Sequence, residues 1–454
     1  MQVSSLRWLC CPFCGGSLSP SLGDLRTGEL EYAVLSCHCN HYPVVAGIPL
    51  LQRGSIRNAR LTAEEVIALI QSGRHREALL ALLAPDRRTF ARMRRLAAVQ
   101  SLSWRHGLAA VWGLGRGCKQ VAALWPGRGS SRTACAVLDG YFRQGKRPEH
   151  YHYFAFRFAH PRYLAGLSFT HLLQQPTQPL LDLACGCGHL IHHLVSRAHG
   201  QPVVGVDISF TALYVAKQWI APAGEYICCA ADSTLPFQTG TFAAVFCTDA
   251  FQYFVNKAIC VRELRRLTQP AGFMLLGALP NARLRGSHAL LKRSRNSRPL
   301  PPEGYQQLIA DMPHCLVATR DVLARYLHKQ GPSLRRSDDL TSLADASFMS
   351  LLASHRPDMI RTYGTFGKWP HAEGCLEVNP LYVYERAKGP DTVRLRRTFP
   401  SCVYAQEYED YPKYLPETIE VRAEIFTDMA QGKHTPELEA LLAQCVVLGM
   451  PQGY

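Results

Sequence analysis

The sequence predicts an α/β protein whose core is an open, mostly parallel sheet. An apolar run at residues 179–183 leads through small residues into a helical stretch, and a second apolar run follows at 203–208. Three further strand-like runs alternate with helical stretches, in the order typical of repeated strand–helix–strand units, at 226–231, 242–250 and 273–278. A cysteine-rich segment before this region predicts an additional small domain.

Composition limits the class of protein. The chain has 454 residues, of which 47% are hydrophobic and 19% charged, so we expect about two to four packed domains and not a disordered chain. Its 17 cysteines are odd in number and mostly lie singly in apolar runs, which argues against a disulfide framework. The sequence contains no signal-peptide pattern and no long uninterrupted apolar stretch. We therefore expect a soluble cytoplasmic protein without membrane contact.

The first feature along the chain is a pair of cysteine motifs within residues 1–52. Cys11 and Cys14 are separated by two residues and followed by two glycines, and Cys37 and Cys39 supply a second pair. Four thiolates suit a structural zinc ion with no open coordination position. The alternatives are that these are buried free cysteines, or that one ligand is replaced by a neighbour, namely Cys10, His38 or His41.

A basic helical connector is expected over residues 53–148. Thr62 and Glu65 form a capping box before one helix, and Asp86 can cap a later helix over 87–100. Between Gln52 and His150 there are 18 basic and 6 acidic residues, so most of the net charge of +15 belongs to this segment. Five arginines of the later helix form either a solvated face, which we favour, or a phosphate-binding surface: Arg87, Arg88, Arg92, Arg94 and Arg95.

A ligand site is expected where the first strands of the sheet end. The bend Gly186-x-Gly188 lets the backbone approach a ligand closely, and the amino terminus of the following helix faces it. The strand at 203–208 ends near Asp207, whose carboxylate can accept hydrogen bonds from both hydroxyls of a ribose. An NAD-binding unit is the structural alternative, but its third glycine would fall at Ile191, which is unsuitable for close helix–strand packing.

The ordered series of motifs over residues 176–280 resembles the class I S-adenosylmethionine-dependent methyltransferases, especially the ubiquinone-type (type 11) branch of small-molecule enzymes. The matching features are the Asp-Leu-Ala-Cys-Gly-x-Gly run that begins at Asp182, then Asp207, the Ala-Asp pair at 231–232, and Leu-Pro-Phe at 235–237. The resemblance implies a Rossmann-like sheet of seven strands in which the last pair is an antiparallel hairpin. Ala184 stands where the family has its first glycine.

The resemblance also implies which residues bind S-adenosylmethionine. Asp182 and Gly186–Gly188 would line the methionine moiety, Asp207 the ribose and Asp232 the adenine amino group. Thr248 and Asp249 would sit under the sulfonium, near the acceptor. Upstream, an aromatic helix could cover the cofactor, although packing of that stripe on the sheet is equally consistent with the sequence. The full set of expected cofactor-binding residues is Asp182, Ala184, Gly186, Cys187, Gly188, Asp207, Ile208, Ala231, Asp232, Thr248, Tyr153 and Arg157.

The acceptor side offers three candidate catalytic residues. Asp249, Gln252 and Tyr253 follow the fourth strand and could face the acceptor. Methyl transfer from a sulfonium requires alignment more than an elaborate catalytic apparatus, so a general base is optional. His189, His192 and His193 have partial metal-ligand spacing. The apolar stripe of the same helix predicts instead that His192 and His193 face solvent.

Residues 6–52 resemble the zinc-ribbon family of small activator subunits for tRNA and protein methyltransferases, which also occurs fused to bacterial methyltransferases. Besides the cysteines, the run Tyr42-Pro-Val-Val-Ala-Gly-Ile-Pro-Leu-Leu51 carries this resemblance. It implies a possible protein partner that binds through the ribbon.

The carboxyl-terminal half is expected to complete the sheet. Alternating apolar and charged residues at 376–385 and 392–399 predict the final antiparallel hairpin. The methyltransferase domain would then span 149–400, with an insertion at 281–372 over the acceptor pocket. Residues 401–454 would form a helical tail with helices at 416–431 and 436–448, the second capped by Thr435.

These features predict an S-adenosylmethionine-dependent methyltransferase that acts on a small-molecule or peptide-derived metabolite. The first alternative is an RNA methyltransferase of the ribosomal-RNA type, in which the ribbon and the basic connector would contact RNA. The second alternative is a non-catalytic scaffold that binds the cofactor without turnover.

Overall fold

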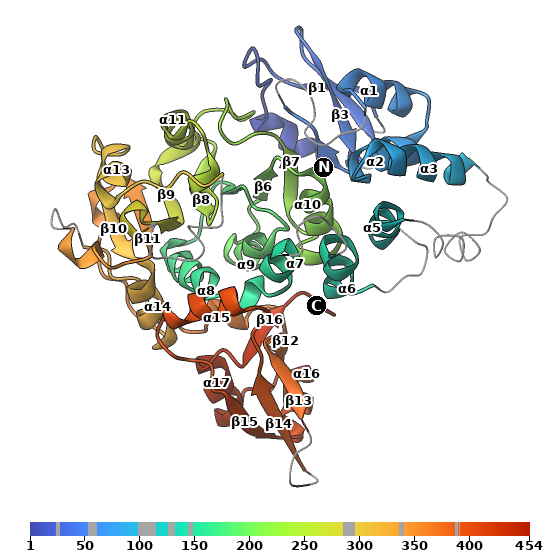
Figure 1. Ribbon diagram of the computed structural model, residues 1–454. Coiled ribbons are helices and arrows are strands. Elements are labelled where there is room, and N and C mark those ends of the chain that lie inside the picture. Colours follow the sequence, from blue (N-terminus) through green and yellow to red (C-terminus); the bar gives the residue numbers. More distant parts are fainter. Residues whose placement is uncertain are drawn as a thin grey trace.

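The computed structural model describes residues 1–23, 28–52, 61–98, 115–125, 132–143, 149–284, 296–335, 340–385, 389 and 391–454. Its centre is a sheet of seven strands in the order β10-β11-β9-β8-β5-β6-β7 (Figure 1). In that order the strands are β10 (His314–Ala318), β11 (Phe348–Ser354), β9 (Thr268–Pro280), β8 (Phe242–Thr248), β5 (Leu180–Leu183), β6 (Val203–Asp207) and β7 (Glu225–Cys228).

The five strands from β9 to β7 run parallel, and β11 runs antiparallel to both of its neighbours. This confirms the expected Rossmann-like sheet with an antiparallel final pair. The predicted position of this pair, at residues 376–385 and 392–399, is wrong, because β10 and β11 both lie within residues 281–372. That segment is therefore not an insertion between strands five and six.

The physical reason lies in burial. All seven residues of β11 are buried, and a strand covered on both faces shows a continuous apolar run instead of alternation. The alternating segments at 376–385 and 392–399 form β12 (Cys375–Val378), β13 (Tyr382–Glu385) and β14 (Thr392–Arg397). β13 and β14 do pair as a hairpin, but in a separate three-stranded sheet with exposed positions.

Helices cover both faces of the central sheet. Neighbouring side chains of β5 pack into two different hydrophobic cores, one on each face of the sheet. Leu180 belongs to the first core and Leu181 to the second. The first core holds α7 (Glu149–Ala155), α8 (Pro161–Ser168), α9 (His189–Arg197) and α10 (Phe210–Val215). It also includes residues of the last part of the chain, from 375 to 454, which we call the carboxyl-terminal module. The second holds α11 (Lys257–Leu267), α13 (Pro302–Gln307) and much of the amino-terminal ribbon.

The ribbon packs against the chain's own sheet. It is a four-stranded antiparallel sheet of β1 (Ser19–Leu22), β2 (Ala33–Ser36), β3 (His41–Val45) and β4 (Ile48–Pro49). Just after β4, Leu51 N donates to Cys228 O of the edge strand β7 at 2.9 Å, and Cys10 N donates to Pro236 O at 3.0 Å. Backbone hydrogen bonds thus attach the ribbon at the β7 edge.

The connector is helical where the structure describes it. α1 (Ala63–Gln71) begins with the expected capping box, since Thr62 and Glu65 bond reciprocally. The connector helices that follow are α2 (His75–Leu83), α3 (Arg87–Ala98), α5 (Arg116–Leu124) and α6 (Ala134–Leu138). A further helix, α14 (Thr319–Leu327), belongs to the sheet domain. Residues 53–60, 99–114, 126–131 and 144–148 of the expected connector lie outside the described residues. None of the described helices is long and apolar enough to cross a membrane.

The last part of the chain is a mixed module and not the helical tail that we expected. It contains α15 (Cys402–Glu409), β15 (Thr418–Arg422), α16 (Glu424–Ala430), α17 (Pro436–Ala443) and β16 (Val447–Met450). The expected helix at 416–431 is split because Thr418–Arg422, with β-branched residues at alternate positions, pairs with β14. Thr435 caps α17 as expected, but Val447–Met450 pairs with β12.

The histidines of α9 are core residues, contrary to the expectation that two of them face solvent. His189 and His193 are buried and His192 is half-buried, because α8 and the carboxyl-terminal module cover the outer face of the helix. His193 Nδ1 lies 2.7 Å from the Tyr163 hydroxyl. Burial lowers the pKa of His189 to about 3 and that of His371, whose Nδ1 lies 2.7 Å from the Tyr326 hydroxyl, to about 4.

We expect the folded state to be sensitive to mild acid. An imidazole whose pKa is near 4 in the folded state and 6.5 in the unfolded state does not affect stability above pH 6.5. As the pH falls below 6.5 the unfolded state takes up the proton first, which removes about 2 kcal/mol per imidazole between pH 7.5 and 5. Urea unfolding midpoints at the two pH values should therefore differ clearly.

A matched pair of variants isolates this effect. His371→Gln keeps a polar side chain that cannot titrate, so its unfolding midpoint should fall less between pH 7.5 and 5 than that of the wild type. The exposed His355→Gln should retain the wild-type pH dependence. Equal pH dependence in His371→Gln and the wild type would contradict the assignment.

Candidate functional site

The turn between β5 and α9 forms one wall of the candidate site. Ala184, Gly186 and Gly188 all have positive φ angles, of 58°, 55° and 78°. A Cβ atom added to Gly188 would lie 2.8 Å from the Cβ of Ala216, so glycine is required both for the backbone conformation and for the space. The Phe154 ring of α7 closes over the turn, 3.0 Å from where a Cβ of Gly186 would be.

Asp207 connects this turn to the end of β6. Its Oδ2 accepts a hydrogen bond from Gly186 N at 3.0 Å, and its Oδ1 accepts one from Ser209 N at 2.8 Å. The carboxylate therefore lies at the junction of two strand ends and is only partly buried. It is placed to bind a ligand that rests on the glycine turn.

Half-exposed residues mark the carboxyl ends of four neighbouring strands that are otherwise buried. They are Ala184, Cys185 and Gly186 after β5, Asp207 and Ile208 at β6, Ala231 and Asp232 after β7, and Thr248 of β8. Open parallel sheets bind their ligands along this edge. The structure thus brings most of the predicted cofactor-binding residues to one accessible row, while Asp182, Cys187 and Gly188 lie buried beneath it.

Asp182 differs from the other acidic residues at this edge. Its side chain is almost fully buried in the centre of the sheet. Burial raises the pKa of this carboxyl to about 8, an effect that the guanidinium of Arg157 opposes only in part. The residue therefore lies beneath the ligand row and not in it.

A buried network of charges lies next to this row. Arg157 Nη1 is 2.8 Å from Asp249 Oδ2, and Arg162 Nη2 is 3.3 Å from the same oxygen. Arg162 Nη1 also pairs with Glu407 Oε2 at 3.0 Å, and His160 Nε2 lies 3.0 Å from that oxygen. The network joins α8, the loop after β8, and α15 of the carboxyl-terminal module.

The network assigns a different role to two predicted residues. Burial alone would raise the pKa of Asp249, but the guanidinium groups of Arg162 and Arg157 hold it below its usual value. A carboxylate that is ionised and paired with two cations is a poor proton acceptor, so the geometry favours Asp249 as a counter-ion over a general base. Arg157, one of the expected cofactor-binding residues, is directed at Asp249 instead.

The other acceptor-side candidates differ in exposure. Gln252 is buried, its Nε2 donates to Asp249 O at 3.1 Å, and its Oε1 has no hydrogen-bond partner within the described ranges. Tyr253 is half-exposed at 50%, and Tyr153 lies with its ring 4.8 Å from the Arg157 guanidinium carbon.

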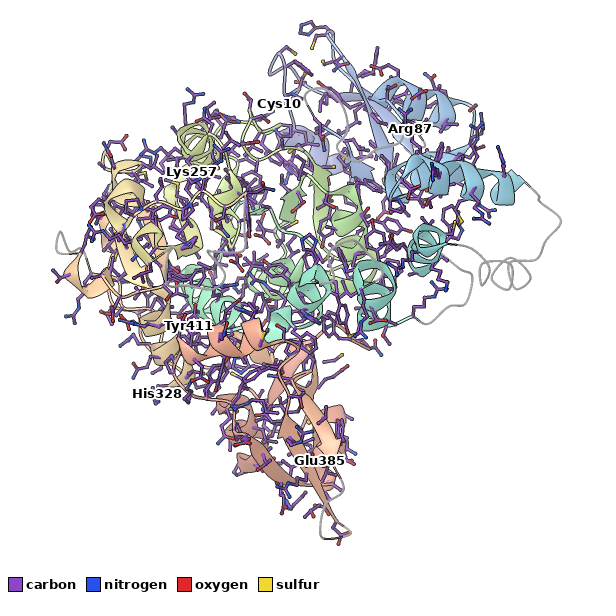
Figure 2. The ribbon with its side chains drawn as sticks, viewed as in Figure 1. Cys10, Arg87, Lys257, His328, Glu385 and Tyr411 are labelled. Atoms are coloured by element: carbon purple, nitrogen blue, oxygen red, sulfur yellow. The ribbon has the colours of Figure 1, made fainter. Side chains whose placement is uncertain are left out.

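Three residues of this network, Arg162, His160 and Glu407, were not predicted as site residues from the sequence. Glu407 lies 158 residues beyond Asp249 in the chain, and both it and Arg162 fall in ordinary helical patterns. Only the fold brings them together. Tyr411, which follows α15 and lies beside α8 (Figure 2), is part of the same buried region.

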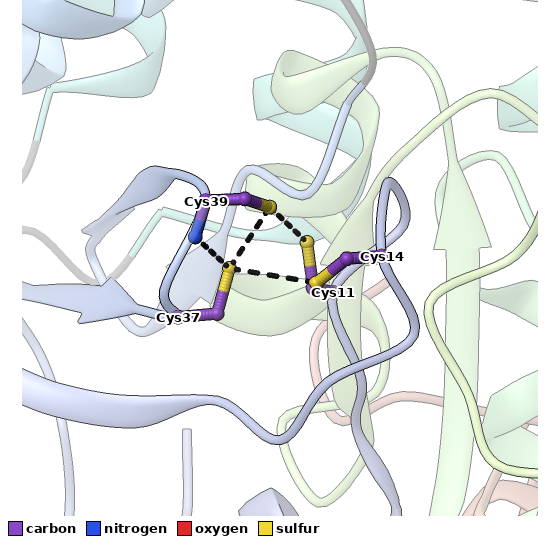
Figure 3. A group of neighbouring side chains, drawn as sticks. All are labelled: Cys11, Cys14, Cys37 and Cys39. Atoms are coloured by element: carbon purple, nitrogen blue, oxygen red, sulfur yellow. Dashed lines mark hydrogen bonds between the residues drawn. The ribbon is translucent and has the colours of Figure 1, made fainter.

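The four predicted cysteines of the ribbon converge. Figure 3 shows Cys11 and Cys14 facing Cys37 and Cys39 across a small gap. The Sγ–Sγ distances are 3.6 Å for Cys11 and Cys39, 3.9 Å for Cys14 and Cys37, and 3.3 Å for Cys37 and Cys39. A tetrahedral ion with bonds of about 2.3 Å to sulfur requires edges of about 3.8 Å.

The alternative ligands are less well placed. Within the described residues, the one cluster of three or more metal-binding side chains consists of these four cysteines and does not include Cys10. His41 Nδ1 lies 2.6 Å from Ser36 Oγ, and His38 Nδ1 lies 4.0 Å from Cys14 Sγ at the margin of the cluster. The donor set therefore fits a thiolate-bound structural zinc.

Comparison with known proteins relates the sheet to one family. Residues 181–276 match the family of methyltransferase domains. Over 131 residues the chain is 33% identical to the demethylmenaquinone methyltransferase of Thermus thermophilus, which covers 28% of this chain and 59% of that protein. Over 91 residues it is 35% identical to an 18S rRNA (guanine-N(7))-methyltransferase of Schizosaccharomyces pombe, which covers 20% of this chain and 33% of that protein.

The chain thus spans about three-fifths of the first relative's length and a third of the second's. Among solved structures, the plantazolicin methyltransferase in complex with S-adenosylhomocysteine is 15% identical, with a TM-score of 0.36, over 49% of this chain and 95% of that protein. The matched residues include the glycine turn, Asp207 and strands β5 to β8. Residues 181–276 thus form a domain that matches the methyltransferase domain family.

Proposed function

We propose that this protein is an S-adenosylmethionine-dependent methyltransferase that acts on a small-molecule or peptide-derived metabolite. The observation that carries the proposal is the accessible row of residues along the carboxyl edge of the sheet, with the Asp207 carboxylate bonded to the amide of Gly186. This arrangement provides a half-exposed carboxylate beside the glycine turn, at the edge where open parallel sheets bind their ligands.

In this proposal the residues divide the cofactor between them. Ala184 and Gly186–Gly188 support the methionine part, and Asp207 with Ile208 holds the ribose hydroxyls. Ala231 and Asp232 bind the adenine, and Thr248 lies near the sulfonium. When bound, the cofactor supplies an electrophilic methyl group. The contribution of the chain is to align the acceptor with that methyl group and to exclude water, which is where most of the rate enhancement of such a displacement arises.

A small acceptor fits the buried network better than RNA does. Arg162, Asp249, Gln252 and Glu407 are at most 8% exposed, so the bulky backbone of an RNA cannot contact them. Arg162 Nε and Gln252 Oε1, and the hydroxyls of Tyr404 and Tyr411, have no hydrogen-bond partner within the described part of the chain. These atoms could provide polar contacts for a small acceptor.

RNA methylation is the second candidate, and the basic connector favours it. Arg87, Arg88, Arg92, Arg94 and Arg95 of α3 are all exposed. One of them is partly neutralised, since Arg94 Nε pairs with Glu77 at 2.6 Å. Figure 1 shows α3 extending outward beyond α2, away from the central sheet. A solvated face remains our preferred interpretation because α3, which carries these arginines, extends away from the central sheet.

We also propose that the ribbon binds one structural zinc ion and stabilises the edge strand β7 of the central sheet. Leu51 and Cys10 already bond to the sheet domain through their backbones. A further protein partner on the remaining ribbon surface is compatible with this arrangement. A scaffold that binds the cofactor without turnover is the third candidate, and it differs from the first two only in catalysis.

Replacing Asp207 should weaken cofactor binding severely. Asp207→Ala removes the acceptor for two ribose hydroxyls and the bonds to Gly186 and Ser209, and each bond to a charged group contributes about 1.5–3 kcal/mol. We expect the dissociation constant for S-adenosylmethionine, measured by calorimetry, to rise about a hundredfold or more. Asp345→Ala, at an exposed carboxylate, is the control. An unchanged constant in Asp207→Ala would refute the site.

Elemental analysis should find one zinc ion per chain. Cys14→Ser or Cys37→Ser should lower the zinc content and the thermal unfolding temperature, because metal binding to a small domain contributes directly to its folding. Cys10→Ser, an adjacent thiol outside the cluster, should retain the ion. Absence of zinc from the purified wild-type protein would remove the assignment.

Transfer of a tritiated methyl group into fractionated host extract separates the three functions. We expect label in the small-molecule or peptide fraction. Charge reversal of Arg87, Arg88 and Arg94 to Glu should leave that transfer unchanged. Label in RNA that disappears in the triple variant would favour the RNA alternative. Cofactor binding without any transfer would favour the scaffold.

A further inference from the structure

A cleft in the carboxyl-terminal module is separate from the cofactor edge. It has a volume of about 440 Å³ and lies where β12, β13 and α16 meet Cys135 of α6 and Tyr454. None of the residues that we assign to the cofactor lines it. The match to the methyltransferase domain family, which spans residues 181–276, does not include it either.

The walls of the cleft are apolar and aromatic. The rings of Tyr384 and Phe426 have centroids 6.0 Å apart and are inclined at 46°, so they form an open corner. Met429 and Met450 contribute flexible thioether side chains to the lining. Tyr384 is 62% exposed, which is unusual for a large aromatic side chain and leaves the corner accessible from solvent.

A single acidic side chain lies in this apolar lining. Glu377 of β12 is half-buried and is the one acidic residue among those that line the cleft. It forms no ion pair within the described residues, and the amide of Gly453 donates a hydrogen bond to it. Partial burial raises the pKa of the Glu377 carboxyl, against the effect of that amide. Burying a carboxylate without a nearby cation costs free energy, because the charge loses part of its hydration. A bound cation would compensate for that loss.

We propose that this cleft binds an organic cation of the alkylammonium class. The charge would face Glu377 and the alkyl groups would rest against Tyr384, Phe426 and the methionines. Aromatic faces attract cations, and they do so most effectively when the cation is weakly hydrated. A metal ion such as Mg²⁺ needs several oxygen ligands, whereas this largely apolar lining offers one acidic side chain, so a quaternary or N-alkylated ammonium fits better.

Tyr454 joins the cleft to the rest of the molecule. It lines the cleft, and its hydroxyl donates to Phe154 O at 2.9 Å in α7, the helix whose Phe154 ring covers Gly186. The cleft is therefore adjacent to the helix that closes the cofactor edge, although binding there does not require methyl transfer.

The test uses the full chain and two probes of nearly identical shape. Choline carries a quaternary nitrogen, and 3,3-dimethylbutan-1-ol carries a carbon atom in its place. In calorimetric or NMR titrations without S-adenosylmethionine, choline should bind saturably and at least about tenfold more tightly than the alcohol. Equal affinities would show a purely apolar cleft, and no saturable choline binding would show no site; either result overturns the proposal.

Variants locate the site. Glu377→Gln should weaken choline binding about tenfold and leave the alcohol unaffected. Tyr384→Leu, which keeps apolar bulk at an exposed position, should weaken it severalfold. Glu420→Gln makes the same charge change at an exposed position of β15 outside the lining and should bind choline normally. Unfolding temperatures equal to that of the wild type exclude loss of fold, and undiminished choline binding in Glu377→Gln would refute the proposal.

Discussion

The buried guanidinium of Arg162 holds three distant parts of the chain together. It lies on α8 and pairs with Asp249 after β8 and with Glu407 on α15. Transferring these charges out of water is costly, and removing one partner from a buried pair typically costs about 3–5 kcal/mol because the other charge is left uncompensated. The acceptor side of the sheet therefore depends on residues from the carboxyl-terminal module, and the module cannot be regarded as an independent appendage.

Features encoded by local residues could be predicted from the sequence. The glycine turn at Gly186 and Gly188 requires positive φ angles that few residues other than glycine adopt, and Thr62 with Glu65 caps a helix through neighbours alone. The parallel strands were recognisable because each is a short continuous apolar run followed by small or polar residues. The four cysteines of the ribbon had the spacing of metal ligands, and the structure brings them together.

Features that depend on distant contacts could not be predicted in this way. The alternating residues of β13 and β14 correctly indicated a hairpin, but alternation does not specify which sheet a hairpin joins. β11 was overlooked because a strand buried on both faces, Phe348–Ser354, has no alternation to detect. His193 was placed at the surface because a helix pattern shows one apolar face and cannot reveal that other elements cover the second face. The pairing of Arg162 with Glu407 has no local signature at all.

The attachment of the ribbon to β7 has a consequence for the order of synthesis. Leu51 bonds to Cys228, which follows it by about 180 residues. At about 5–20 residues per second, the ribbon leaves the ribosome roughly ten to forty seconds before its docking surface exists. During that interval the apolar residues that later face the sheet, among them Trp8 and Leu9, have no partner from the sheet. A metal ion that closes the four thiolates early would give the nascent ribbon a defined shape before the strand it protects has been made.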